Sequence, residues 1–364
     1  MELGTRPVRV VIAAGGTAGH VMPALAVADA LRRRGAEVSF IGVRNRAGSE
    51  LVAARGYPED RITLKGLARR VTPANIVALG LAAMALPTAL RVLRRRRADV
   101  VIAAGGYVGG PVALAAWLSR RPLMLTEADS HLGLANRIAA PLAKRVALAF
   151  ALSGRGGAKY LVTGRPVSDE VRAATRVSGR RALGIDPGAT CVLIAGGSQG
   201  ARTLNEAAID AFGSNPPIDI IHVAGPQNVD EVRRELDRRR PGPRYRLIGF
   251  LDNFHDAIAA ADLVVSRSGG SVFEVAAIGR PSILVPYPYA TNDHQAKNAR
   301  WLADAGAAVL LSDADCDGER LRNLVGALLS DREGLAAMAD AARAMGRPES
   351  ADLIADAALG LVRS

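Results

Sequence analysis

Short runs of β-branched and aliphatic residues alternate along the chain with longer segments in which apolar residues recur at helical spacing. Segment 22–34 is of the second kind, because its apolar residues from Ala24 to Leu31 fall on one face of a helix. Continuous Val and Ile strands separated by helices are typical of parallel sheets that helices cover on both faces. The pattern therefore predicts an α/β fold, with strands at 8–14, 37–42, 99–104, 122–126, 145–149, 160–163, 191–195, 218–223, 245–248, 262–265, 281–285 and 307–311.

One strand–glycine–helix unit occurs twice in the chain. Residues 10–20 read VVIAAGGTAGH, and residues 191–201 read CVLIAGGSQGA. With a length of 364 residues, this repetition predicts two Rossmann-like domains that face each other across a cleft and bind a ligand at the carboxyl ends of both sheets. We expect the first domain at 1–164 and the second at 165–341, with a C-terminal helix at about 342–364 that packs back on the first.

Glycine-rich loops follow three of the expected strands, as AAGGTAGH, AAGGYVGGP at 103–111, and AGGSQGA. Glycine lets the backbone approach a ligand closely, and the first amides of the next helix favour an anion. A tight turn without a ligand is the alternative. The Gly-Gly-x-x-Gly spacing differs from the G-x-G-x-x-G fingerprint, and the second strand leads into Val43 and Arg44 without an acidic residue for a ribose. The loops therefore argue against an NAD dehydrogenase, and the sequence contains no P-loop motif.

The composition is that of a large globular protein, with 49% hydrophobic and 4% aromatic residues. We expect no signal peptide, because the N-terminal residues lead into a strand within about ten positions. Cys191 and Cys316 match no metal or redox spacing. This pattern is typical of a reducing cytoplasm.

Positive charge is concentrated in the first half of the chain. Residues 1–163 contain 24 Lys and Arg against 9 Asp and Glu, whereas the whole chain has a net charge of +12. Residues 71–90 carry no charge, but Pro73 and Pro87 argue against a transmembrane helix. A buried helix with a solvated arginine turn is the plain alternative. We expect instead a partly exposed apolar surface with a basic rim that docks on anionic lipid headgroups, the rim being Arg91, Arg94, Arg95, Arg96 and Arg97. No aromatic residues are interleaved with these arginines, so nucleic acid is the disfavoured partner.

Six blocks occur in one order that resembles the MurG family of GT-B glycosyltransferases, glycosyltransferase family 28. They are GGTAGHVMPALAVADAL, GGYVGGPVALAA, GLANR, GGSQGARTLNE, SRSGGSVFEVAAIGRPSILVPYP and NDHQAKNARWL. The resemblance implies inverting transfer of N-acetylglucosamine from UDP-GlcNAc to the C4 hydroxyl of MurNAc in lipid I, giving lipid II for peptidoglycan. It also implies a peripheral protein at the cytoplasmic face of the membrane, with anionic inner-leaflet phospholipids and other cell-wall synthesis proteins as partners.

The first glycine loop ends in His20, where an imidazole can take the proton of an acceptor hydroxyl. A helix-terminal histidine that merely packs is the alternative, and the resemblance favours the base. Ser198, Gln199 and Gly200 would present amides and a hydroxyl to the UDP phosphates without a metal or other cofactor. By resemblance, Glu274 binds the ribose, Leu251 contacts uracil through its backbone, and the remaining UDP-GlcNAc contacts are Thr17, Ala18, Gly19, Asp129, Gly270, Ser271, Gln295 and Asn298, with Arg165 and His294 less firmly placed.

Three departures from the family pattern affect the donor site. One residue fewer precedes Glu274, Asp129 stands where an asparagine is usual, and Ser168 replaces an arginine for which Arg165 or Arg172 can substitute. Asp313 begins a D-x-D-x-D-G run that lacks the glutamate of a calcium loop, and we interpret it as a solvated turn. Two alternatives therefore remain: a related enzyme with another UDP-sugar or a glycolipid acceptor, and a noncatalytic UDP-sugar-binding subunit.

Overall fold

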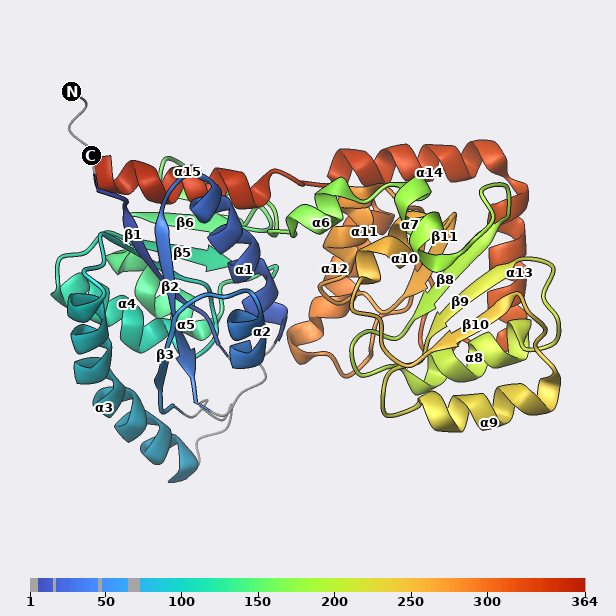
Figure 1. Ribbon diagram of the computed structural model, residues 1–364, viewed down its shortest axis with the longest axis horizontal. Coiled ribbons are helices and arrows are strands. Elements are labelled where there is room, and N and C mark those ends of the chain that lie inside the picture. The colour runs from blue at the N-terminus through green and yellow to red at the C-terminus, as the bar shows by residue number, and fades with distance from the viewer. Residues whose placement is uncertain (1–5, 16–17, 45–47, 65–72, 364) are drawn as a thin grey trace. The chain divides into compact units, whose positions relative to one another are not determined.

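The computed structural model describes residues 6–15, 18–44, 48–64 and 73–363. The chain divides into two compact units, which are 1–168 with 347–364, and 169–346 (Figure 1). The divisions expected after residues 164 and 341 lie a few residues before the observed ones.

In the described part of the first unit, seven parallel strands pair in the order β3-β2-β1-β4-β5-β6-β7. These strands are β1 Arg9–Ala13, β2 Glu37–Val43, β3 Glu59–Ile62, β4 Val100–Ala103, β5 Leu123–Glu127, β6 Arg145–Leu148 and β7 Tyr160–Val162. The helices of this unit are α1 Ala18–Arg33, α2 Gly48–Ala54, α3 Pro73–Arg95, α4 Gly109–Leu118, α5 Leu134–Ala139, η1 Ala140–Leu142 and α15 Ser350–Arg363.

The described part of the second unit contains six parallel strands in the order β10-β9-β8-β11-β12-β13. They are β8 Cys191–Ala195, β9 Asp219–Val223, β10 Tyr245–Ile248, β11 Leu263–Ser266, β12 Ser282–Leu284 and β13 Ala308–Leu310. The helices are α6 Asp169–Ala173, α7 Arg176–Leu183, α8 Arg202–Phe212, α9 Val229–Arg239, α10 Phe254–Ala260, α11 Val272–Ile278, η2 Thr291–Asp293, α12 His294–Ala303, α13 Gly318–Ser330 and α14 Arg332–Met345. Both sheets thus have the doubly wound order of Rossmann-like domains, which confirms the predicted fold class.

Strand β1 shows why these strands consist of continuous apolar residues. Val10 and Ile12 belong to a core cluster with α1, whereas Val11 and Ala13 face a second cluster on the other side of the sheet with α3 and α4. Alternate residues of one strand therefore bury on opposite faces, so both must be apolar.

Strand β3 is the one described strand that the hydrophobic pattern did not predict. Its sequence, EDRI, has a single buried apolar residue, Ile62. The strand lies at the edge of its sheet, where charged residues are common because one side of the strand has no neighbour.

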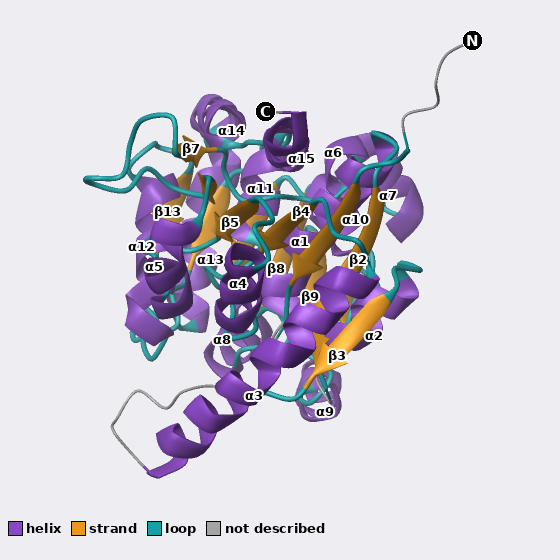
Figure 2. Cartoon of the chain, turned by 90° about the vertical axis from the view of Figure 1, so that its left-hand side faces the viewer, coloured by secondary structure: helices purple, strands orange, loops and turns teal. Residues whose placement is uncertain are grey.

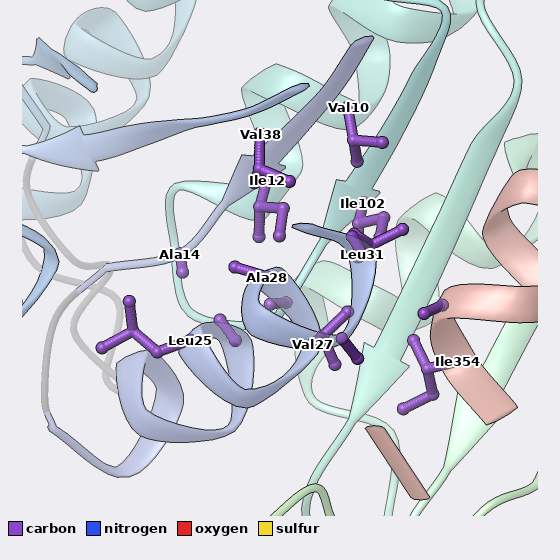
Figure 3. Close-up of a cluster of buried hydrophobic side chains, with 14 of the residues drawn as sticks. Val10, Ile12, Ala14, Leu25, Val27, Ala28, Leu31, Val38, Ile102 and Ile354 are labelled. Carbon is purple, nitrogen blue, oxygen red and sulfur yellow. The ribbon is translucent and has the colours of Figure 1, made fainter. Parts of the chain in front are cut away.

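The C-terminal helix α15 completes the core of the first unit. Ile354 lies in the same cluster as Val27 and Leu31 of α1 (Figure 3). The guanidinium of Arg34 at the end of α1 pairs with Asp356 at 2.6 Å, and the hydroxyl of Ser350 donates to the carbonyl of Gly164 at 2.8 Å. The helix therefore joins the last residues of the chain to the unit that contains the first.

The glycine loops lie at the point in each sheet where the strand order reverses. Among the described residues, Ala14 and Gly15 follow β1 and the loop at 104–108 follows β4, and these two strands are neighbours in the first sheet. The loops at 196–201 and 267–271 follow β8 and β11, which are neighbours in the second. Ligands of open α/β sheets bind at this point, so the topology brings candidate residues together within each unit.

Candidate active site residues

His20 lies in the first turn of α1 and is half-buried. The second glycine loop passes beside its ring. A Cβ built on Gly105 would lie 3.1 Å from His20 Nδ1, and the φ of Gly105 is +81°, which side chains rarely adopt. The neighbouring loop therefore needs glycine to make room for the imidazole. Of the residues expected beside His20, Thr17 lies outside the described residues and Ala18 begins α1.

Arg165 holds the backbone of this turn from the end of the first unit. Its guanidinium donates to the carbonyl of Gly19 at 2.6 Å and to that of Ala128 at 3.5 Å. The sequence predicts Arg165 near the donor, as a substitute for an arginine that Ser168 replaces. The structure brings its guanidinium to the loop of His20.

The surroundings of His20 favour its neutral form. Burial lowers the pKa of the imidazole, the carboxylate of Asp129 opposes this shift, and the cation of Arg165 adds to it. A neutral imidazole at neutral pH can accept a proton, which a base requires.

Glu127 is a buried carboxylate that no sequence motif indicated. It accepts hydrogen bonds from the amides of Asp129 at 3.2 Å and Gly133 at 2.8 Å, and from Asn136 Nδ2 at 2.9 Å. Burial raises its pKa, and these hydrogen bonds oppose the shift. Glu127 and His20 line one small pocket of this unit, together with Pro23, Ala128, Gly164 and Ile354. Residues 126–137, TEADSHLGLANR, contain both Glu127 and Asn136, but no local pattern indicates that they pair.

The third glycine loop joins β8 to α8 in the second unit. Residues 197–199 are exposed, and the amide of Gly200 donates to the carbonyl of Gly197 at 2.9 Å. Gly200 has a φ of +76° and lies too close to the carbonyl of Ala224 to accept a Cβ. Ala201 precedes α8 and makes no side-chain hydrogen bond to the first amides of this helix, which is a position that favours an anion.

Hydrogen bonds connect the loop that follows β11 to the first half of α12. Asn298 Nδ2 donates to the carbonyl of Ser268 at 3.0 Å, and the Ser268 hydroxyl donates to the carbonyl of Gln295 at 2.8 Å. Gly270 and Ser271 lead directly into α11, whose first turn carries the half-buried Glu274. Asn298 is buried, so it supports the loop from behind.

Gln295 lies at the start of α12, and its Oε1 accepts the amide hydrogen of Tyr287 at 3.0 Å. His294, beside it, uses Nδ1 to donate to the carbonyl of Thr291 at 2.8 Å. Leu251, which follows β10, packs its side chain against a core cluster of this unit. The side chain of Leu251 is therefore engaged with the core of the second unit.

The interpretation of the D-x-D-x-D-G run as a solvated turn is wrong for Asp313. This carboxylate pairs at 2.5 Å with Arg267, whose side chain is buried after β11. Asp317 caps α13 by accepting the amide of Arg320 at 2.7 Å, and Asp315 is exposed. Within the described residues, no three His, Cys, Asp or Glu side chains gather to hold a metal ion.

Helices α3, α4 and α5 belong to the first unit (Figure 2). Each of them has apolar side chains that are exposed to solvent. They contact one another in that order. No helix among the described residues is long and apolar enough to cross a bilayer. The described large apolar residues that are exposed on the three helices are Met84, Leu114, Trp117, Leu118, Leu134 and Ile138.

The arginines at the end of α3 fall into two groups. Arg95 and Arg96 both pair with Asp60 of β3, the second at 2.7 Å. Arg91 and Arg94 are exposed, and so is Arg97, which follows the helix with a φ of +50°. The cations of Arg95 and Arg96 are therefore engaged with the edge strand, whereas those of Arg91 and Arg94 face solvent.

Comparison with known proteins matches the two units to one family. Residues 10–148 match the glycosyltransferase family 28 N-terminal domain, and residues 191–354 match the glycosyltransferase family 28 C-terminal domain. A solved structure, MurG of Acinetobacter baumannii, is 30% identical with a TM-score of 0.79, covering 97% of this chain and 100% of that one.

Two curated relatives carry the same name, UDP-N-acetylglucosamine--N-acetylmuramyl-(pentapeptide) pyrophosphoryl-undecaprenol N-acetylglucosamine transferase. The protein of Halothermothrix orenii is 36% identical over 353 residues, covering 93% of this chain and 95% of the relative. That of Halorhodospira halophila is 42% identical over 351 residues, covering 95% and 96%. These matches confirm the resemblance inferred from the six sequence blocks, and the chain belongs to glycosyltransferase family 28, among its N-acetylglucosamine transferases of the MurG type.

Proposed function

We propose that this chain transfers N-acetylglucosamine from UDP-GlcNAc to the C4 hydroxyl of MurNAc in undecaprenyl-pyrophosphoryl-MurNAc-pentapeptide, with inversion at the anomeric carbon. The relatives named for this reaction match the chain over nearly its full length. The observation that carries the proposal is the neutral, half-buried His20, held at the switch point of the first sheet by Gly105 and Arg165.

His20 is the base in this proposal. As the acceptor oxygen attacks the anomeric carbon, the bond from that carbon to the UDP oxygen breaks, and the hydroxyl proton passes to the imidazole. General-base help of this kind is worth roughly 10²–10⁴-fold in rate. Because the pKa of His20 is lowered, the ring is ready to accept the proton at neutral pH.

The glycine loop of the second unit receives the diphosphate. Its exposed residues Ser198 and Gln199 and the N-terminus of α8 supply hydrogen bonds and a favourable dipole as negative charge grows on the leaving UDP, while the Gly200 amide, which donates to Gly197, keeps the loop in shape. We propose that these groups act without a metal cofactor.

The proposal takes the other donor contacts from Leu251, from Glu274 of α11, from α12 and from Asp129. The Glu274 carboxylate would accept the ribose hydroxyls, and the backbone of Leu251 would face uracil. The Gln295 amide would bind sugar hydroxyls, while Asn298 holds the loop behind it. Asp129 would accept the N–H of the acetamido group, in the first unit near His20.

We further propose peripheral binding to the cytoplasmic face of the cell membrane through helices α3, α4 and α5. Trp117 is 51% exposed and Ile138 is 67% exposed, so both can enter the interface between headgroups and acyl chains. Arg91 and Arg94 are exposed on α3 and can contact anionic headgroups, each worth about 1 kcal/mol near the surface. Such a surface would bring the protein to a lipid-linked acceptor, whose lipid chain lies in the membrane.

A panel of donors tests the proposal. Purified protein, a short-chain lipid I analogue and each of UDP-GlcNAc, UDP-GalNAc and UDP-glucose are incubated, and UDP release and glycolipid product are both measured. We expect efficient transfer from UDP-GlcNAc. Preference for another donor would support a related glycosyltransferase, and UDP-GlcNAc binding without any product would support a noncatalytic binding subunit.

A further inference from the structure

A chain of buried polar groups lies beneath the glycine loop of the second unit, and the reaction described above does not use it. His222 of β9 is fully buried between Tyr245 of β10 and Asn205 of α8. Its Nδ1 is 2.8 Å from the Tyr245 hydroxyl, and its Nε2 is 3.0 Å from Asn205 Oδ1. Asn205 and Tyr245 are themselves buried.

The hydrogen bonds of Asn205 fix where the hydrogens lie. Asn205 Nδ2 donates to the carbonyl of Ala224 at 3.1 Å, so Oδ1 is the atom that faces the histidine. An amide oxygen can only accept, and His222 therefore carries its hydrogen on Nε2. The unprotonated Nδ1 then accepts from the Tyr245 hydroxyl. Burial lowers the pKa of His222 to about 3, so this neutral form persists at neutral pH.

The carbonyl of Ala224 connects this chain to the loop. It also accepts from Asn228 Nδ2 at 3.2 Å, and the same amide group donates to the carbonyl of Gln199 at 3.0 Å. Gly200 packs against Ala224 too closely for a side chain. A displacement of Ala224 must therefore move Gln199 or Gly200, or break these contacts.

We infer that Tyr245, His222 and Asn205 are positioning residues, which fix the Ala224 carbonyl and thereby hold residues 197–200 in the conformation that receives the donor diphosphate. The inference rests on the proposed function for the identity of the ligand. Because the three side chains are buried, they cannot contact the donor, and any effect on donor binding must pass through the loop.

Tyr245→Phe tests this inference, since it removes the hydroxyl and keeps the ring. We expect the affinity for UDP and for UDP-GlcNAc to fall roughly two- to tenfold, the usual worth of one buried hydrogen bond, with KM rising more than kcat falls. Tyr57→Phe is the matched control. Tyr57 is a buried tyrosine of the first unit whose hydroxyl donates to Asp29 at 2.6 Å, so its loss costs stability without reaching the loop.

Two readouts need no bound ligand. Amide exchange at Gly200, which donates to Gly197 at 2.9 Å, should be faster in Tyr245→Phe than in wild type and unchanged in Tyr57→Phe. Two-bond ¹H–¹⁵N spectra of the wild type should show the hydrogen of His222 on Nε2. A hydrogen on Nδ1, or unchanged exchange and unchanged affinity in a folded Tyr245→Phe, would overturn the inference. If the wild type fails to bind UDP, the proposed function falls, and the exchange comparison still decides whether the buried chain holds the loop.

Discussion

The ring of His20 packs closely against Gly105, with 3.1 Å between His20 Nδ1 and a Cβ built on that glycine. Gly105→Ala should therefore press on the imidazole and lower kcat, by at most the roughly 10²–10⁴-fold that general-base help is worth, while UDP affinity stays unchanged. Gly35→Ala is the control, because Gly35 has a similar φ of +78° with nothing within 4 Å. Equal activity losses in both variants would show that backbone strain, not the ring, is responsible.

His20→Gln should leave donor binding intact and lower turnover by roughly 10²–10⁴-fold, because the amide can form hydrogen bonds but cannot take a proton. His294→Gln should retain most of its turnover, since Nδ1 of that ring is engaged with Thr291. Steady-state kinetics with UDP-GlcNAc and a lipid I analogue measure both. A defect of His20→Gln confined to donor KM would make His20 a binding residue.

The pH dependence of kcat/KM should depend on the charged residues near His20. On the acid side of the profile, kcat/KM decreases as the pH is lowered, because the base gains a proton. Since the pKa of His20 is lowered, this acid limb should lie below pH 6.5, about the ordinary pKa of histidine. Asp129→Asn removes a charge that raises the pKa, so the limb should move to lower pH. Arg165→Gln removes a charge that lowers it, so the limb should move to higher pH. Shifts in the same direction would contradict this account.

Glu274→Ala should weaken UDP binding by about 1–3 kcal/mol, because two ribose hydroxyls lose a charged acceptor. Glu319→Ala is a suitable control, since this exposed glutamate occupies the first turn of α13 in the same unit. Calorimetry measures the affinity of both variants and of the wild type for UDP. If both variants bind like wild type, the ribose contact lies elsewhere.

The arginines at the end of α3 should fall into two groups, one that binds the membrane and one that stabilises the fold. Arg91→Gln with Arg94→Gln should weaken binding to anionic vesicles, an effect that high salt reduces because the Debye length contracts to about 3 Å at 1 M. Arg95→Gln with Arg96→Gln should instead lower the melting temperature, because both cations pair with Asp60. Vesicle sedimentation and thermal unfolding measure these effects. The opposite assignment of the two pairs would refute the docking surface.

Local sequence patterns were sufficient to predict most of the fold. Runs such as Val10–Ala13 must be apolar because both faces of the sheet are covered, and the glycine loops after β1 and β8 show where the helices begin. The hydrophobic pattern did not predict strand β3, because an edge strand needs little apolar surface.

The site was predicted less completely, because several of its contacts join residues far apart in the chain. His20 ends a recognisable loop, but the need for Gly105 beside it follows from the pairing of β1 with β4. The pairs Arg267–Asp313 and Arg96–Asp60 likewise connect separate segments. The spacing of residues along the sequence predicts contacts within one helix or strand. Contacts between residues of separate elements can be identified only once the packing of those elements is known.

The most direct measurement is the identity of the glycolipid formed from UDP-GlcNAc and a lipid I analogue by the purified protein. Mass spectrometry and NMR of the isolated product should show one added N-acetylglucosamine, joined to the C4 oxygen of MurNAc in the β configuration that inversion of the donor requires. The same incubation with His20→Gln should give the same product at a rate lower by roughly 10²–10⁴-fold. A product with another sugar, another linkage or retained configuration, or full activity without His20, would contradict the account.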